Sequence, residues 1–543
     1  MGRDEGAGRK ARGARSEAQG SRRKAKGGNT TESPLRHAPS PLRPRPLRHA
    51  PFASRLEEPE EIARRLLKLA LALGDVEQAE AYVSRNRMTM TRLETLRRGQ
   101  RVAGPAAQQV STFMNMEACV RVVVKGAVGT AATVHLDSAS LGRVASDARS
   151  IARAMPPDPN FWSLAGPSGR RPARLAPDRA ILEGGAFEAL VDGSAEAAGL
   201  CPSGVDLAGS VIAISEVFGV CNSLGIDTGR CEDTRAVAQL TAERVEGGEV
   251  LSSGMGWSAS RSLSGLDAAA AARQALELGL LRPRLRTVPE GDYDVLLGPY
   301  SVADMLDHML VPQLGMAQIY TGTSWLPAER AATGNGVTLR RPLLGTTVAA
   351  PSVSLREEPH LEGAMGSRTF DDEGVPTAPR PLIDEGIWRG VFSNSYYAHL
   401  YGLEPPGNGF RFGPRPGRMA SAPLSNSPTN LVLRPGDLSF EELVERCRCD
   451  ALYIPRTWYT YPTRYGASGF SSSNRSTAFL IRKGELVPVA PNAFKLRGDM
   501  ARVLREARGI GREASTATTW SASFCSIVPH VLSAGLRVEK PSE

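Results

Sequence analysis

The sequence predicts an α+β protein in which an N-terminal α+β region packs on a larger, β-dominated C-terminal domain. The sheet of that second domain is expected to be twisted and antiparallel or barrel-like. Three observations lead to this prediction. Residues 57–84 have the spacing of an amphipathic helix, residues 120–136 have the pattern of a β-hairpin, and strands and turns alternate beyond Gly291. The 543 residues are enough for two or three domains with substantial cores.

The first 52 residues are predicted to be a disordered basic tail. Residues 1–50 are rich in Gly, Arg, Ser and Pro, and their thirteen Lys or Arg against four Asp or Glu account for the whole formal net charge of +9. Such a segment buries too little apolar surface to offset the entropy lost on ordering. A basic tail attracts RNA or anionic lipid by charge alone. Because residues 1–50 lack aromatic residues and the remaining chain is neutral, we expect no specific nucleic-acid partner.

Composition also predicts a cytoplasmic protein that does not enter a membrane. The sequence contains no apolar run of 18 or more residues, and its beginning lacks the charged-then-apolar pattern of a secretory signal. The seven cysteines are odd in number and widely spaced, which favours a reducing compartment over a disulfide framework.

Residues 57–158 form the first predicted domain, of α+β type. A cluster of glutamates begins its first helix, where the helix dipole favours anions. Gly74 interrupts this helix, and a strand follows. The hairpin turns at Lys125-Gly126, and Asp137 or Ser138 then caps a second helix. The apolar residues that share one face of the first helix are Ile62, Leu66, Leu69 and Leu73.

Two further domains are predicted after the first. Residues 159–288 form a central α+β domain, with a β-rich stretch at 209–257 and an alanine-rich helix near 265–281. Residues 289–540 form the β-rich C-terminal domain, which opens with a strand that leads into a helix. Other helices in that domain are expected near 439–447 and 495–507.

The most distinctive stretch is 363–392, GAMGSRTFDDEGVPTAPRPLIDEGIWRGVF. A run of glycine, three acids and glycine predicts a tight, shaped loop, and the next residues predict a hairpin that turns at Asp384-Glu385-Gly386. Adjacent carboxylates repel one another unless cations or N–H donors meet them. The loop is therefore a solvated or N–H-satisfied turn, or a functional loop beside a peptide or ion site. We expect N–H donors from neighbouring strands to fix it, with at least one carboxylate buried.

The pattern GSRTFDDEGVPT followed by LIDEGIWRGVF resembles the TldD/PmbA family of metallopeptidase-related modulator proteins, in which PmbA is also called TldE. The resemblance spans roughly residues 75–538. The family-motif loop comprises Gly366, Ser367, Phe370, Asp371, Asp372, Glu373 and Gly374. The other segments that carry the resemblance are VCNSLGID, PTNLVLRPGDLSFEEL, IRKGELVPV and VPHVLSAGLRV.

The resemblance implies a zinc site in active TldD-type members, on the helix that follows the GDYDVLLGP-like strand. There an H-E-x-x-x-H or H-E-x-x-H motif grips zinc through two histidines on one face, and its glutamate activates the water. At that position this chain has Asp307, His308 and Pro312, without a histidine pair or the glutamate. We therefore expect no catalytic residue and no metal in this chain. One alternative is a rearranged zinc site made by Asp304, His308 and Cys525.

Aromatic residues are concentrated at Trp458, Tyr459, Tyr461 and Tyr465, ahead of a Gly/Ser-rich stretch. If they face a groove, they could hold an extended peptide by edge pairing and side-chain pockets. The other interpretation is that they pack in the core.

The resemblance implies three candidate functions. The first is a PmbA/TldE-type subunit without its own zinc, which pairs with a TldD-type zinc peptidase in a hetero-oligomer and together with it degrades unfolded peptides. The second is a self-sufficient metallopeptidase with rearranged ligands. The third is a non-enzymatic peptide-binding protein, with a homo-oligomer as the other possible assembly.

Overall fold

The computed structural model describes residues 57–98, 101–332, 338–412, 417–447, 449–519 and 524–541. The tail predicted to be disordered, residues 1–52, lies outside these residues. The chain divides into the units Met1–Leu56 and Glu57–Glu543, and the second unit contains both of the large sheets.

A six-stranded antiparallel sheet is built from the first half of the second unit, in the order β3-β2-β1-β4-β5-β6. It draws strands from both segments predicted as separate domains, because β1 pairs with β2 on one side and with β4 on the other. The predicted hairpin turn at Lys125-Gly126 joins β2 to β3, with both residues at positive φ. The strands are β1 (Gln78–Arg98), β2 (Arg101–Val124), β3 (Ala127–Thr133), β4 (Val205–Asn222), β5 (Cys231–Glu246) and β6 (Glu249–Ser260).

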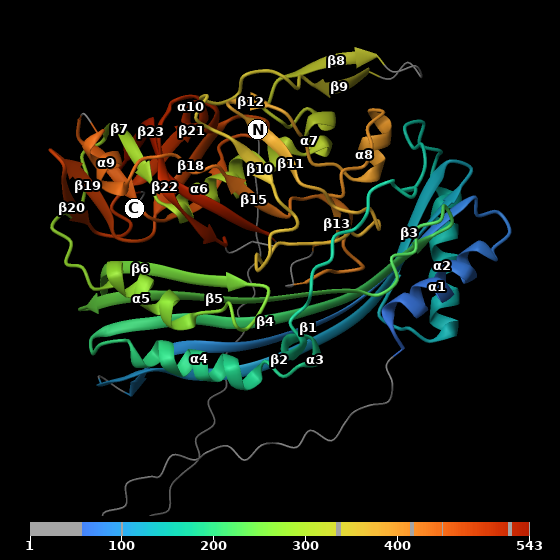
Figure 1. Ribbon diagram of the computed structural model, residues 1–543, viewed down its shortest axis with the longest axis horizontal. Helices are drawn as coiled ribbons and strands as arrows, with labels where there is room; N and C mark the ends of the chain where they lie inside the picture. Colours follow the sequence, from blue (N-terminus) through green and yellow to red (C-terminus); the bar gives the residue numbers. More distant parts are fainter. Residues whose placement is uncertain are drawn as a thin grey trace, which may run out of the picture. The chain divides into compact units, whose positions relative to one another are not determined.

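Five helices pack on one face of this sheet (Figure 1). Successive side chains of a strand point to opposite faces, so Ala81 and Val83 of β1 pack against α1 and α2 while Tyr82 and Ser84 point to the other face. The first helix ends earlier than the sequence predicts, and Gly74 follows it at φ 71°. The helices are α1 (Pro59–Leu71), α2 (Ser138–Ala154), α3 (Arg179–Glu183), α4 (Phe187–Gly199) and α5 (Ala268–Gly279).

The second half forms a 13-stranded sheet, which confirms the α+β class and the β-dominated C-terminal part. The sheet is mixed, whereas an antiparallel one was predicted: β15 pairs with β23, and β16 with β7, in parallel. Its strands are β7 (Gly291–Leu297), β10 (Leu355–Glu357), β11 (Arg380–Asp384), β12 (Ile387–Trp388), β15 (Asn430–Leu433), β16 (Ala451–Ile454), β17 (Thr457–Pro462), β18 (Gly469–Asn474), β19 (Ala478–Arg482), β20 (Glu485–Val489), β21 (Lys495–Asp499), β22 (Ala507–Ala517) and β23 (Cys525–Glu539).

Shorter elements surround this sheet. Two small hairpins are β8 (Ala328–Ala332) with β9 (Thr338–Pro342), and β13 (Gly409–Phe410) with β14 (Ser425–Asn426). No described helix is both long enough and apolar enough to cross a membrane. The helical segments are α6 (Pro299–Met305), the π-turn η1 (Leu306–Leu310), the 3-10 turn η2 (Val311–Leu314), α7 (Met316–Thr321), α8 (Ser395–Leu400), α9 (Phe440–Glu445) and α10 (Met500–Arg505).

The hairpin predicted after the motif loop is present as β11 and β12. Glu385 and Gly386 at its turn have φ values of 47° and 80°, the left-handed conformation that two-residue hairpin turns require. The second strand is shorter than predicted and ends at Trp388, whose side chain is fully buried in the core of the C-terminal part.

Candidate functional site

The family-motif loop is buried between the six-stranded sheet and the C-terminal part. The side chains of Asp371, Asp372 and Glu373 are at most 1% exposed. Gly374 has φ 78°, and a Cβ there would lie 2.5 Å from Ile226 in the segment between β4 and β5, so only glycine fits. The prediction that N–H donors fix the loop and that at least one carboxylate is buried is confirmed, and the loop is not a solvated turn. The expected source of the donors is only partly right, because among the backbone donors Gly409 lies in a strand, whereas the others lie in the loop itself, in α8 or beyond the end of β13.

Asp371 holds the shape of the loop itself. Its carboxylate accepts hydrogen bonds from the backbone N–H groups of Glu373 at 3.0 Å, Val375 at 2.9 Å and Gly409 at 2.9 Å. These donors satisfy the carboxylate without a cation and join the loop to β13.

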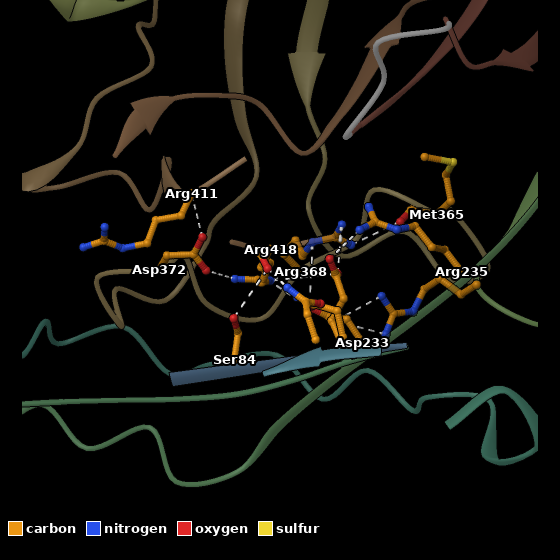
Figure 2. Close-up of polar contacts among 12 residues, drawn as sticks. Ser84, Asp233, Arg235, Met365, Arg368, Asp372, Arg411 and Arg418 are labelled. Atoms are coloured by element: carbon orange, nitrogen blue, oxygen red, sulfur yellow. Dashed lines mark hydrogen bonds and ion pairs between the residues drawn. The ribbon is translucent and has the colours of Figure 1, made fainter. Parts of the chain in front are cut away.

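Asp372 lies between two arginines (Figure 2). It accepts a hydrogen bond from the backbone N–H of Arg411 at 2.6 Å and pairs with the guanidinium of Arg418. Arg418 is fully buried; it also pairs with Asp233 of β5 at 2.9 Å, and its guanidinium lies 3.9 Å from the ring centroid of Phe218 in β4. Asp372 and Arg418 therefore connect the loop to the six-stranded sheet.

Glu373 makes a second connection to the sheet. It accepts hydrogen bonds from Arg121 of β2 at 2.8 Å and from the backbone N–H of Ser395 at 2.7 Å. Arg121 also pairs with Glu80 of β1 at 2.6 Å. Burial opposes ionisation of Glu373, but Arg121 and Ser395 outweigh it and hold the pKa of this carboxyl below its usual value.

The remaining charges form a continuous buried cluster on the same face of the sheet. The carboxylates outside the loop lie on strands: Glu80 on β1, Glu216 on β4 and Asp233 on β5. Among the arginines, Arg261 follows β6 and Arg368 lies in the motif segment. This ion-pair cluster comprises Glu80, Arg121, Glu216, Asp233, Arg235, Arg261, Arg368, Asp372, Glu373, Arg411 and Arg418. Its buried, mutually paired charges suit it to holding the two halves of the chain together rather than to chemistry on a substrate.

The sequence alone did not identify the members of this cluster outside the loop. A usable signal was present in the strands, because Glu216 interrupts the apolar run VIAISEVFGV, and Asp233 and Arg235 interrupt the buried strand β5. A charged residue within an otherwise apolar strand is rarely buried unless it is paired.

The predicted zinc position lies on α6 and the turns that follow it. The α-helix ends at Met305, and the chain continues as a π-turn and then a 3-10 turn that contains Pro312. Asp304 is 1% exposed and accepts hydrogen bonds from the hydroxyls of Thr457 and Thr460. Its other oxygen lies 3.2 Å from Nδ1 of His308.

His308 is therefore held as the cation of an ion pair. Burial favours its neutral form, but the hydrogen bond and charge of Asp304 raise its pKa to about 9. Nδ1 also lies 2.9 Å from the Asp304 backbone carbonyl. A carboxylate or carbonyl beside Nδ1 also orients histidines that bind zinc through Nε2, so a zinc site here depends on further ligands nearby.

Cys525 does not complete a metal site with these residues. Its Sγ lies 3.0 Å from Oδ1 of Asn430, and burial raises the pKa of its thiol to about 11. Within the described ranges, no group of three His, Cys, Asp or Glu side chains could hold a metal ion. The alternative set Asp304, His308 and Cys525 is therefore wrong, because the fold separates the cysteine from the Asp304–His308 pair.

The Asp304–His308 pair predicts a pH dependence of stability. The folded pKa of about 9 exceeds the ordinary 6.5, so the contribution of the pair is complete below about pH 6.5 and is lost as the pH rises through 9. We expect the difference in unfolding free energy between wild type and His308→Gln to shrink from pH 7 to pH 10. Chemical denaturation at each pH measures it, and a difference that does not change with pH would contradict the pairing.

The aromatic residues of β17 and the following turn do not pack in the core. Tyr459, Tyr461 and Tyr465 are exposed, and Trp458 is half-buried beneath the guanidinium of Arg456. Tyr459 has φ 54°, at the irregularity where β17 loses register with β18. The core interpretation is therefore wrong for the three tyrosines, which form an exposed aromatic patch with Trp458.

Comparisons with known proteins find similarity to the same family that the motif loop resembles. Residues 290–540 match the family model of the PmbA/TldA metallopeptidase C-terminal domain. The "Metalloprotease" of Methanothermobacter thermautotrophicus is 28% identical over 178 residues, which cover 31% of this chain and 35% of that protein. The "Metalloprotease TldD homolog" of Haemophilus influenzae is 29% identical over 149 residues, which cover 26% of this chain and 28% of that protein. The aligned region thus spans about a third of each relative.

The fold itself is similar over most of the chain to a solved structure. TldE from Thermococcus kodakarensis superposes with a TM-score of 0.72 over 88% of this chain and 99% of that one, at 19% identity. The family-model match lies in the C-terminal part, which also contains the motif loop. Residues 290–540 of this chain therefore match the C-terminal metallopeptidase domain of the PmbA/TldA family, and the fold of the chain is similar to that of TldE.

Proposed function

We propose that this chain is a non-catalytic, PmbA/TldE-type subunit that pairs with a TldD-type zinc peptidase in the cytoplasm and takes part in the degradation of unfolded peptides. The observation that supports this most strongly is the state of His308. It is the histidine nearest the expected zinc position, and it is committed to an ion pair with Asp304 whose carboxylate is held by two threonines.

The residues present do not fit a peptidase zinc. Such a site needs about three protein ligands and a base for the bound water. Here Cys525 is a buried thiol beside Asn430, and the turn after α6 carries Pro312 where a second histidine is expected. The family frame, in contrast, is intact, because the motif loop and its ion-pair cluster are fully assembled. A chain that keeps the family fold without the zinc ligands suits a non-catalytic subunit. The partner subunit would then bind the zinc of the complex.

The exposed aromatic patch suits contact with the peptide. Tyrosines supply large, rigid surfaces that also form hydrogen bonds, and β17 pairs with β18 on one side, with no strand on its other side among the described residues. An extended peptide could therefore lie along β17.

Reconstitution tests the pairing. This chain is co-expressed with a TldD-type protein that carries an intact H-E-x-x-x-H or H-E-x-x-H motif, and hydrolysis of an unstructured fluorogenic peptide is measured. We expect the pair to co-purify and to cleave the peptide, and neither chain alone to do so. The control replaces the partner's motif glutamate with glutamine and should abolish activity without separating the chains. Hydrolysis by this chain alone would contradict the proposal and favour a self-sufficient peptidase.

A further inference from the structure

The hairpin formed by β17 and β18 carries basic residues without acidic ones. Between Asp450 and Glu485 the sequence has four Arg, one Lys and no Asp or Glu, although the chain beyond residue 50 is neutral overall. Three of these arginines lie at the ends of the hairpin strands: Arg456 precedes β17, Arg464 follows β17 and Arg475 follows β18. Basic residues therefore bracket the exposed aromatic patch.

Two of these arginines are accessible to a ligand. Arg464 and Arg475 are exposed, and in the described part of the chain neither forms an ion pair with a carboxylate. Arg456 is 8% exposed, and its guanidinium packs on the ring of Trp458 at 4.8 Å. The backbone N–H of Arg475 donates to the carbonyl of Arg456 at 3.3 Å, so Arg475 lies where β17 begins. Arg475 and Arg464 thus provide one accessible guanidinium at each end of β17.

The acidic residues of the adjoining helical segment do not cancel these charges. β17 packs against α6 and η1, whose two acids are Asp304 and Asp307. Asp304 is 1% exposed and is neutralised by His308. Asp307 accepts a hydrogen bond from the hydroxyl of Thr519 and keeps its charge. Three arginines against this one carboxylate give the hairpin and the adjoining helical segment a positive net charge.

The three exposed tyrosines add hydrogen-bond donors to this positive surface. Tyr459, Tyr461 and Tyr465 are 62%, 45% and 88% exposed. Their hydroxyls form no hydrogen bond with the described residues, so each can donate to an oxygen of a ligand. A carboxylate accepts hydrogen bonds from such hydroxyls, and its two oxygens also match the fork of a guanidinium. The donors on this surface therefore suit the carboxylates of acidic side chains.

From this arrangement we infer that the exposed aromatic patch selects peptide segments that are rich in Asp and Glu. The inference rests on the proposed function, in which the patch contacts an extended peptide along β17, and it adds the chemical class of that peptide. β17 has six residues, which at about 3.3 Å each span about 20 Å and match an extended segment of about six residues. Acidic side chains near the two ends of that segment pair with Arg464 and Arg475, while its middle lies over the tyrosines. Segments rich in Lys or Arg are repelled by the same two arginines.

Fluorescence anisotropy with the whole chain, in the absence of any partner, tests this selectivity. The probes are labelled, unstructured Gly/Ser peptides of one length in which the same positions are Glu, Gln or Lys. The variants are Arg464→Gln/Arg475→Gln and the charge-reversed Arg464→Glu/Arg475→Glu. The matched control is Arg282→Gln/Arg446→Gln, which changes two exposed arginines outside the hairpin that likewise form no ion pair with the described residues. Residues 1–50 are present in every protein compared, so their charge contributes equally, and circular dichroism checks that each variant folds.

We expect Arg464→Gln/Arg475→Gln to bind the Glu peptide about three- to tenfold more weakly than wild type, the effect of losing two exposed ion pairs. Its affinity for the Gln peptide should not change, and the control should match wild type with every peptide. The charge-reversed variant should lose still more affinity for the Glu peptide and gain affinity for the Lys peptide. Raising the ionic strength from about 0.1 M to about 1 M should shrink these differences, because salt screens exposed charges.

An unchanged affinity of Arg464→Gln/Arg475→Gln for the Glu peptide, or an equal loss in the control, would overturn the inference. A labelled oligothymidylate that binds more tightly than the Glu peptide and loses affinity in the same variant would also overturn it, because the arginines would then serve a phosphate backbone. The measurement needs no TldD-type partner. Failure of the two chains to pair would therefore refute the proposed pairing and leave the selectivity of the patch standing.

Discussion

Replacing Asp372 with alanine should lower the free energy of unfolding by about 3–5 kcal/mol, the usual cost of breaking a buried ion pair by removing one partner. The carboxylate is fully buried and is shared by the guanidinium of Arg418 and the backbone N–H of Arg411. Its removal leaves Arg418 with Asp233 at 2.9 Å and Glu216 at 3.9 Å as ion-pair partners and with the Phe370 carbonyl at 3.5 Å as a hydrogen-bond acceptor. Chemical denaturation followed by circular dichroism measures the change.

The matched control is Asp384→Ala, at the exposed turn of the neighbouring hairpin. Surface substitutions away from special features usually change stability by less than about 0.5 kcal/mol. If Asp372→Ala and Asp384→Ala cost the same, the ion-pair cluster does not hold the two halves of the chain together, and the role assigned to the motif loop is wrong.

Replacing Trp388 with alanine should cost about as much, roughly 3–5 kcal/mol, because it removes a large buried side chain and leaves a cavity. Trp388 ends β12 with none of its surface exposed, and its indole N–H donates to the Gly390 carbonyl at 2.8 Å. Thermal and chemical unfolding of the variant measure this loss.

Trp162→Ala is the control for that experiment, since the Trp162 side chain is 81% exposed. It removes the same atoms from the surface, so its effect should stay near zero. A small effect of Trp388→Ala would mean that the core collapses around the missing ring.

Local sequence patterns were sufficient for elements whose signals lie close together in the chain. Helix α2 begins at Ser138 with Asp137 as its cap, as the sequence predicts, because capping depends on a residue three positions before its donor. The turn at Glu385-Gly386 was likewise predictable, since an acidic-Gly pair between apolar runs requires positive φ.

Contacts between distant residues could not be predicted in the same way. Arg121 and Glu373 are separated by 252 positions, and no local pattern pairs them. The sequence showed that the three acids of the loop needed partners, but not which residues would supply them.

Tertiary pairing also overrode one helix prediction. A helix was predicted over residues 495–507, but the first five of these form β21, which pairs with β18 and β23, and only Met500–Arg505 are helical as α10. Strand formation there depends on neighbours that arrive from elsewhere in the chain. The exposure of the β17 tyrosines escaped prediction for a related reason, because period-two spacing does not say which face of a strand is covered.

Zinc content of the purified chain is the most direct test of the central claim, that the ligands of a peptidase zinc are replaced here by an ion pair. The purified wild-type chain and the His308→Ala variant are each dialysed against micromolar zinc and then against metal-free buffer. Their zinc content is then measured by inductively coupled plasma mass spectrometry. We expect far less than one zinc per chain in both proteins, and no peptide hydrolysis by either. One zinc per wild-type chain that is lost in His308→Ala, together with hydrolysis by the isolated wild type, would contradict it.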